Sequence, residues 1–308
     1  MHPAPSIILF TTLSGLGYGL AAMLGLGLLD ASATATGFAH VLALGLIAAG
    51  LLSSTLHLGN PQRAWRAFSQ WRTSWLSREG MLAVIAFVPL TISAAASLWL
   101  GERLPVAGLI GAVLCAATVY STAMIYASLR SVRAWNTQLT PLCYLLFALA
   151  GGLVLASFLA TLGAGPVGLA AFLAAKAVVW AWVAKFAWWW RMAGEAPLST
   201  PESATGLGFI GKVRLFEPPH LNGNYLTNEM GFRVARRHAA KLRLIAVLLG
   251  GLVPVLILGV VVLTAGQGSL IAPVAAGAAV LCFVAGVLTE RWLFFAEARH
   301  AVMNYYGG

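Results

Sequence analysis

Residues 141–162 read PLCYLLFALAGGLVLASFLATL, a run of 22 residues without a charged side chain. As an α-helix this run would be about 33 Å long, enough to cross the roughly 30 Å hydrocarbon core of a bilayer. Lipid offers no water to unpaired backbone groups, so such a segment must be helical. Seven further apolar stretches of this kind occur, at roughly 5–29, 36–58, 79–100, 105–129, 166–190, 241–265 and 270–296. The sequence therefore predicts an all-α polytopic membrane protein, an eight-transmembrane-helix bundle that forms a single integral membrane domain over residues 1–308.

The composition supports the same class. Of the 308 residues, 60% are hydrophobic and only 9% are charged, and the mean hydropathy is +0.85. Soluble domains carry about 45–50% apolar and about 25% charged residues, so a soluble protein of this size could not cover its surface. The first apolar stretch follows no Lys or Arg and is longer than the hydrophobic region of a signal peptide, about 7–15 residues. We therefore expect it to remain as a helix, although Ala31-Ser32-Ala33 resembles a cleavage site.

The net charge of +10 follows from 19 Lys and Arg against 9 Asp and Glu. An even number of spans puts both termini on one side, together with loops 59–78, 130–140 and 191–240. Basic residues concentrate near the cytoplasmic ends of membrane helices, which predicts cytoplasmic termini and no role in nucleic-acid binding. Arg103 alone lies in a loop on the other side, whereas fifteen basic residues lie on the side of the termini: Arg63, Arg66, Arg72, Arg78, Arg130, Arg133, Arg191, Lys212, Arg214, Arg233, Arg236, Arg237, Lys241, Arg243 and Arg299.

Two of the predicted cytoplasmic loops are distinctive. In 59–78, aromatic residues recur at helical spacing between arginines, after Asn60 as a candidate N-cap and Pro61 as a first helical residue, which predicts a short helix in the headgroup layer. The 191–240 loop has about 50 residues, and loops this long are usually functional or disordered. It is either a flexible linker with basic stop-transfer residues or a docking surface for a cytoplasmic partner. Its mixture of aromatic, apolar and turn residues favours the docking surface.

Three polar residues converge at the predicted cytoplasmic end of the second and third spans. His57 closes one span, Glu79 opens the next, and Arg63 lies between them. A quinone site needs a hydrogen-bond partner for a carbonyl oxygen and a proton route to water, which a histidine and a carboxylate can supply. Each residue alone has an ordinary explanation: His57 as an interfacial histidine bonded to backbone, Glu79 as a first-turn residue favoured by the helix dipole.

Other polar residues lie within the spans. Glu290 and Arg291, in the cytoplasmic third of the last span, form either a structural pair or part of a proton path. We expect Lys185 to reach the interface by snorkelling and Lys176 to face the bundle interior. The run 188–190, three tryptophans, is typical of an interfacial aromatic belt.

Haem b is a competing use of the histidines, because intramembrane haem takes its ligands from facing helices. His40 and His57 are 17 residues apart on one span, about 25 Å along a helix, so they cannot share an iron. His238 and His300 flank the last two spans on one side and are the candidate haem ligands. No CxxC pair occurs, so we expect no metal site of the usual cysteine spacing, and the cysteines are packing residues: Cys115, Cys143 and Cys282.

Residues 56–64, LHLGNPQRA, and 76–79, LSRE, resemble the membrane-anchor subunit family of dimethyl sulfoxide reductase, as does 289–295, TERWLFF. The resemblance implies that the chain binds a quinone, ubiquinone or menaquinone, and docks an iron–sulfur subunit that connects to a molybdopterin catalytic subunit. It implies that His57 and Glu79 serve the quinone, and Arg63 matches the motif arginine. The sulfur substrate would be processed on the partner, so no catalytic residue for that substrate is expected here.

The predicted orientation selects a branch of that family. Together with the opening 6–19, SIILFTTLSGLGYG, it resembles the anchors of cytoplasmic sulfite-oxidising molybdoenzymes. We therefore expect a quinone-binding anchor that passes electrons from the iron–sulfur subunit of a sulfite dehydrogenase to the quinone pool. The alternatives are an anchor of a sulfoxide-type reductase that takes electrons from quinol, a haem b electron carrier and a small-solute transporter.

Overall fold

The computed structural model describes residues 3–56, 60–194, 199–214, 216–217, 234–266 and 270–306, and these residues form helices without any strand. Eight of the helical segments are long and apolar enough to cross a membrane, so the prediction of an all-α polytopic membrane protein is confirmed. In chain order, the segments are α1 (Pro5–Leu26), α2 (Thr34–Thr55), α3 (Trp75–Ala95) continued by η2 (Ala96–Leu100), α4 (Pro105–Ala127), α5 (Leu139–Leu159) continued by η3 (Ala160–Ala164), α6 (Val167–Gly194), α9 (Val234–Val247) with η4 (Leu248–Leu252) and α10 (Val253–Thr264), and α11 (Ile271–Ala296).

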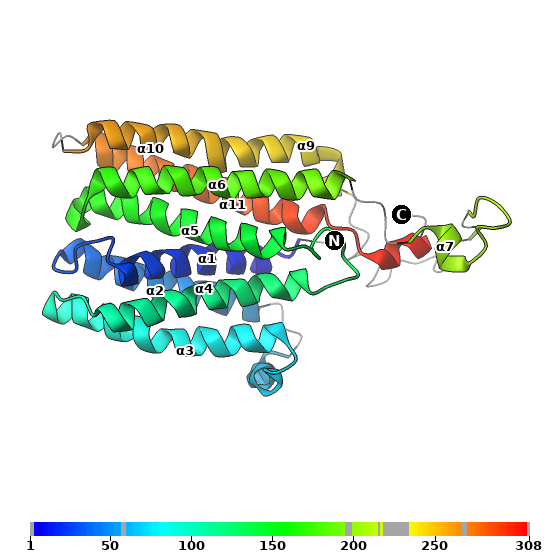
Figure 1. Ribbon diagram of the computed structural model, residues 1–308, viewed down its shortest axis with the longest axis horizontal. Coiled ribbons are helices and arrows are strands. Elements are labelled where there is room, and N and C mark those ends of the chain that lie inside the picture. Colours follow the sequence, from blue (N-terminus) through cyan, green and yellow to red (C-terminus); the bar gives the residue numbers. More distant parts are fainter. Residues whose placement is uncertain are drawn as a thin grey trace.

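The helices form two groups that lie side by side (Figure 1). In the first group α1 packs on α2 and α4, and α3 packs on α4 and α2. In the second group α6 packs on α5 and α10, and α11 packs on α5, α9 and α10. The two groups meet through α1 and α5, with further contacts of α5 to α4 and of α11 to α1. This junction places polar residues of both groups close to one another.

Glycines allow α1 and α5 to approach within backbone contact. A Cβ atom added to Gly19 would overlap the backbone carbonyl of Ala148, and one added to Gly152 would overlap the backbone of Gly19. Small residues let helix backbones pack closely in a membrane, where no hydrophobic force drives helices together. Gly25 of α1 makes the same kind of contact with Gly108 of α4.

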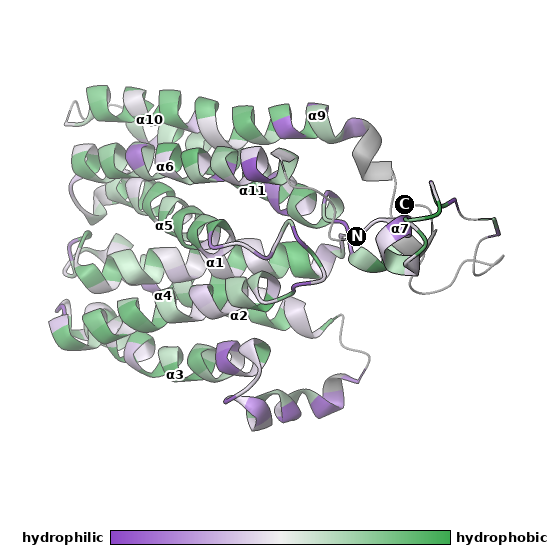
Figure 2. Ribbon diagram, turned by 45° about the vertical axis from the view of Figure 1, so that its right-hand side comes forward, coloured by the Kyte–Doolittle hydropathy of each residue, from purple (hydrophilic) through white to green (hydrophobic). Residues whose placement is uncertain are grey.

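The extramembrane elements lie at one end of the bundle, with both termini (Figure 1). They are the 3-10 helix η1 (Pro61–Gln70), the short helix α7 (Pro201–Thr205) and the 3-10 helix η5 (Ala301–Tyr306). Figure 2 shows hydrophilic ribbon concentrated in η1 and near the ends of α3, α9 and α11 on that side. The basic residues assigned to one side therefore do share one end of the bundle in the described chain.

The predicted surface helix at 59–78 differs from the observed one. Its helical part is confined to η1, and the Asn60 side chain makes no capping hydrogen bond. Instead Ser74 caps α3, accepting a hydrogen bond from the backbone N–H of Ser77 at 3.5 Å. The third span thus begins at Trp75 rather than at residue 79, because the hydroxyl cap ends the loop earlier, and Glu79 lies in the second turn of the helix.

The Gly19–Gly152 contact can be tested by adding one methyl group. We expect Gly19→Ala to destabilise the protein by about 1–3 kcal/mol. The added methyl group would overlap backbone atoms of Ala148, and backbone cannot move aside by a rotamer change. Gly45→Ala on α2 is the control, since a Cβ there meets nothing within 4 Å. Thermal unfolding in detergent measures the difference, and equal stability of the two variants would contradict the close contact.

Candidate functional site

Glu79 is buried inside the first group of helices. Its side chain is 4% exposed, and its carboxylate accepts a hydrogen bond from the Thr122 hydroxyl of α4. Thr122 is also within 3.1 Å of the backbone carbonyl of Thr118. A carboxylate hidden from water at the start of a membrane helix is costly and is typical of functional positions. The first-turn explanation is therefore wrong for Glu79, which bonds to a side chain of the neighbouring helix instead.

Of the other two residues of the predicted quinone site, the structure describes only Arg63. Arg63 lies in η1 with its side chain exposed, and His57 lies outside the described residues. Phe68 of η1 faces the start of α3, since a Cβ added to Gly80 would lie 3.4 Å from its ring. The surface helix η1 therefore packs beside Glu79, but the side chain of Arg63 is exposed, whereas the Glu79 carboxylate is buried.

A second buried acid lies in the other group of helices. Glu290 of α11 is fully buried, and its Oε1 is 2.5 Å from Nζ of Lys185 on α6. Its Oε2 is 3.3 Å from Nε of Arg291, which is 3% exposed. The predicted Glu290–Arg291 pair is thus part of a three-residue cluster, and Lys185 is the member that sequence reasoning missed. Lys185 does not snorkel, because this carboxylate neutralises it inside the bundle.

Aromatic rings surround both cations of this cluster. Lys185 Nζ lies 4.0 Å from the Trp188 ring centroid and 5.3 Å from that of Trp189. Arg291 Cζ lies 4.0 Å from the centroid of Tyr144. Ring faces attract cations, most strongly where water is excluded. Trp188 and Trp189 are therefore buried partners of a lysine and not a lipid-facing belt.

The two predictions for the lysines of α6 are reversed by the structure. The sequence predicts that Lys176 faces the interior, but its side chain is exposed, and its Nζ lies 5.3 Å from the ring centroid of Phe172. Position 185 falls on the face that packs against α11, and position 176 does not. Helical phase, rather than depth along the span, decides which lysine is buried.

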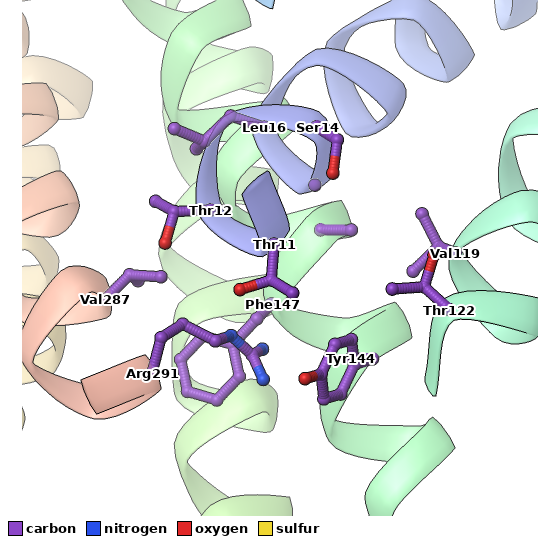
Figure 3. A pocket seen from close by; sticks show the side chains of 12 residues that line it. Thr11, Thr12, Ser14, Leu16, Val119, Thr122, Tyr144, Phe147, Val287 and Arg291 are labelled. Atoms are coloured by element: carbon purple, nitrogen blue, oxygen red, sulfur yellow. The ribbon is translucent and has the colours of Figure 1, made fainter. Parts of the chain in front are cut away.

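A small cavity lies between α1, α4, α5 and α11. Its volume is about 20 Å³, which is room for one water molecule. Figure 3 shows Thr11, Thr12, Tyr144 and Arg291 directed toward this space, with Thr122 on the opposite wall. The cavity therefore separates the residue that holds Glu79 from the Lys185–Glu290–Arg291 cluster.

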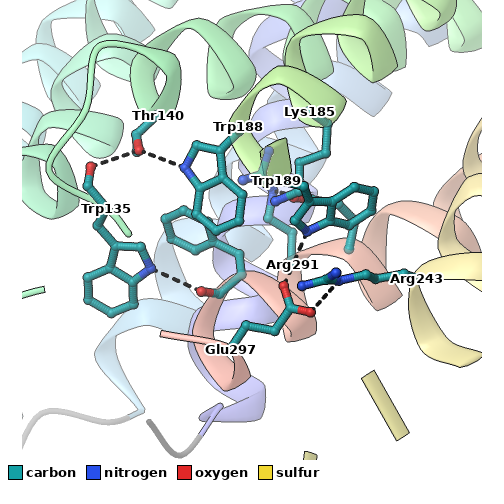
Figure 4. A network of polar contacts seen from close by, with 10 residues as sticks. Trp135, Thr140, Lys185, Trp188, Trp189, Arg243, Arg291 and Glu297 are labelled. Atoms are coloured by element: carbon teal, nitrogen blue, oxygen red, sulfur yellow. Dashed lines mark hydrogen bonds and ion pairs between the residues drawn. The ribbon is translucent and has the colours of Figure 1, made fainter. Parts of the chain in front are cut away.

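A network of tryptophan and ionic contacts fixes the end of the second group (Figure 4). Arg243 Nε of α9 lies 2.6 Å from Glu297 Oε1, and Trp189 Nε1 donates to Glu297 Oε2 at 3.2 Å. Trp188 Nε1 donates to Thr140 Oγ1 at 3.3 Å. These contacts tie α5, α6, α9 and the end of α11 together beside the buried cluster.

The candidate haem ligands lie at the same end. His238 is exposed on α9, and His300 is half-buried, with its Nδ1 accepting a hydrogen bond from the backbone N–H of Val302 at 3.1 Å. Within the described ranges, no group of three or more His, Cys, Asp and Glu side chains could hold a metal ion. The haem hypothesis for His238 and His300 stays a prediction.

Part of the 191–240 loop forms an ordered extension beyond the bundle. Thr200 and Ser203 make a capping box around α7, and Glu202 Oε1 accepts a hydrogen bond from the backbone N–H of Val213 at 3.1 Å. Hydrogen bonds from its own backbone N–H and from Thr200 lower the pKa of the Glu202 carboxyl. Two aromatic side chains of this extension are almost fully exposed, Phe209 at 86% and Phe216 at 97%.

Comparison with known proteins identifies the family. Residues 1–191 match the family model described as the DMSO reductase anchor subunit (DmsC). The chain therefore belongs to the DMSO reductase anchor subunit family, and it is a multi-pass membrane protein that anchors a complex with catalytic partner subunits. It is 35% identical to a sulfite dehydrogenase subunit of Allochromatium vinosum over 333 aligned positions, which cover 99% of each chain. No solved structure gives a significant match.

The buried ion cluster can be tested by removing one cation. Lys185→Met should destabilise the protein by about 3 kcal/mol, the lower end of the range for a broken buried pair, because Arg291 remains beside Glu290. Lys176→Met on the same helix is the control and should leave stability nearly unchanged, since Lys176 is exposed. Thermal unfolding in detergent measures both, and similar midpoints would show that Lys185 is not buried against Glu290.

Proposed function

We propose that the chain is the quinone-reactive anchor of a molybdenum and iron–sulfur sulfite dehydrogenase, passing electrons from the iron–sulfur subunit to the quinone pool. The observation that carries this proposal is Glu79, a carboxylate buried against Thr122 at the end of the bundle where the extramembrane segments gather. The likeness to a sulfite dehydrogenase subunit over the full chain supports the choice of sulfite as the partner's substrate.

The residues present suit a quinone. Quinone supplies two-electron, two-proton redox chemistry when bound, so a site for it needs a group that exchanges protons in a place shielded from bulk water. Glu79 meets this need, because its carboxylate is buried beside a hydroxyl that can hold its orientation. We assign His57 as the hydrogen-bond partner of a quinone carbonyl oxygen and Arg63 as a further polar contact from η1.

We place the end of the bundle that carries the termini on the cytoplasmic side of a bacterial inner membrane. The basic residues of η1 and of the helix ends on that side support this orientation. The iron–sulfur subunit would dock there, with the molybdopterin subunit beyond it. Exposed aromatic side chains on an ordered extramembrane segment are typical of a protein interface, so we assign Phe209 and Phe216 to this contact.

The site assignment is tested on the assembled complex. We expect Glu79→Gln to lower sulfite:quinone turnover by at least about 100-fold, because an amide keeps the hydrogen bond to Thr122 but cannot exchange a proton. His57→Ala should also lower it. Glu102→Gln is the control, since Glu102 is exposed at the opposite end of the bundle.

Measurements on the complex and on this subunit can contradict parts of the proposal or support an alternative. Wild-type quinone turnover in both Glu79→Gln and His57→Ala would remove these residues from the site. A complex that oxidises quinol and reduces a sulfoxide, with no sulfite oxidation, would reverse the direction of electron flow. A haem signal in the reduced-minus-oxidised spectrum of this subunit would support the alternative use of His238 and His300.

The docking assignment is tested by affinity between the subunits. Phe209→Ser combined with Phe216→Ser should weaken binding of the iron–sulfur subunit by about thirtyfold or more, the loss typical of truncated interface aromatics. Phe209→Leu, which keeps an apolar side chain, should weaken it much less. Co-purification of coexpressed subunits under increasing salt measures retention, and full retention of the double variant would move the interface elsewhere.

A further inference from the structure

Three buried hydrogen-bonding groups face the same cavity without a partner. Thr12 Oγ1, the Tyr144 hydroxyl and Arg291 Nη1 make no well-aligned hydrogen bond to a described residue, and each belongs to a side chain that is at least nine-tenths buried. All three residues line the cavity between the two groups of helices (Figure 3). Arg291 Cζ lies 4.0 Å from the centroid of the Tyr144 ring. Buried polar groups without partners are strongly unfavourable, so the cavity requires an occupant.

The size and lining of the cavity define that occupant. A volume of about 20 Å³ accommodates one water, which needs at least about 10–15 Å³ and two to four polar partners. A quinone ring or a phosphate is too large for this space. The ligand class is therefore a single water molecule, which can accept hydrogen bonds from Arg291 and donate or accept them at the two hydroxyls.

The position of this water is significant because of what lies on each side. Thr122 lines the cavity and donates to Glu79 in the first group of helices. Arg291 lines it from the second group and pairs with Glu290, which pairs with Lys185.

The charges of Lys185, Arg291 and Glu290 sum to zero only when an ionised Glu79 is added to them. Lys185, Arg291 and Glu290 carry a net charge of +1 in a region without bulk water, where an uncompensated charge is costly. Within the described chain, two further acidic side chains are buried: Glu297, which is paired with the partly exposed Arg243, and Glu79, which has no cationic partner among the described ion pairs. An ionised Glu79 brings the sum to zero, and a proton taken up by Glu79 leaves the set positive.

We propose that one ordered water occupies this cavity and joins the Glu79–Thr122 pair to the Lys185–Glu290–Arg291 cluster. Thr12, Tyr144 and Arg291 are then positioning residues that favour the ionised carboxylate of Glu79, and hence release of its proton to a bound quinone. This role rests on the proposed function, whereas the water itself does not.

The water is tested by a pair of matched variants in the full chain. Thr12→Val and Thr11→Val remove hydroxyls of adjacent residues that line the same cavity. The Thr11 hydroxyl is already bonded to the backbone carbonyl of Ile7 at 2.9 Å, so its loss should leave the thermal midpoint nearly unchanged. Thr12→Val should lower the midpoint, because a bound water loses a partner. A dry cavity gives the opposite result, since removing an unpaired buried hydroxyl then raises the midpoint or leaves it unchanged.

The role is tested by turnover of the assembled complex with Tyr144→Phe, which keeps the ring beneath Arg291 and removes the hydroxyl. We expect kcat for quinone reduction to fall about tenfold, as it would if the ionised fraction of Glu79 fell by the same factor. KM should stay unchanged, and the solvent deuterium isotope effect on kcat should become larger. Tyr120→Phe, an exposed tyrosine beside Trp75, is the control.

The outcomes separate the two levels of the proposal. Wild-type kcat in Tyr144→Phe, with a lowered midpoint in Thr12→Val, would overturn the role and retain the water. A midpoint that rises in Thr12→Val would overturn the water. Wild-type turnover in Glu79→Gln would overturn the proposed function, and a lowered midpoint in Thr12→Val would then still establish the water.

Discussion

The backbone contact between α1 and α5 at Gly19 and Gly152 is the constraint on which the other features depend. A methyl group at either position would overlap backbone atoms of the facing helix, so the distance between the two groups of helices is set by the absence of side chains. At this distance, Thr12 of α1 and Tyr144 of α5 reach one small cavity. A larger distance between α1 and α5 would give lipid or solvent access to the buried charges, and a smaller distance would leave no space for water.

Charged side chains are buried next to the junction between the two groups of helices. A lone Lys185 or Glu290 inside a membrane would be costly, and the 2.5 Å ion pair between them offsets part of that cost. The rings of Trp188 and Tyr144 add attraction to the two cations. The result is a cluster with one positive charge in excess, which faces α4 across the cavity, where Thr122 donates its hydrogen bond to Glu79.

The sequence predicts the spans well, because a run of about 20 apolar residues leaves a membrane helix as the one arrangement that satisfies its backbone. It also singles out Glu79, since a carboxylate beside an apolar run is conspicuous. It does not reveal Thr122, because a threonine in an apolar helix is ordinary and its partner is 43 residues away. The position of Lys185 near the helix end wrongly predicts exposure, because its burial is decided by the helical phase of its side chain, which points toward Glu290. The tryptophans at 188 and 189, one turn further along, were the available signal that this face is buried.

The location of Glu290 and Arg291 bears on how much of the chain the site requires. The family model matches residues 1–191, which contain Glu79, Tyr144 and Lys185 but not α11. A bundle limited to the first six spans would bury Lys185 against tryptophan rings without its carboxylate, 2.5 Å away in the full chain. It would also lose the Arg291 wall of the cavity. The last span is therefore needed to neutralise a charge carried by the sixth, and it supplies the Arg291 side chain at the cavity between the two groups of helices.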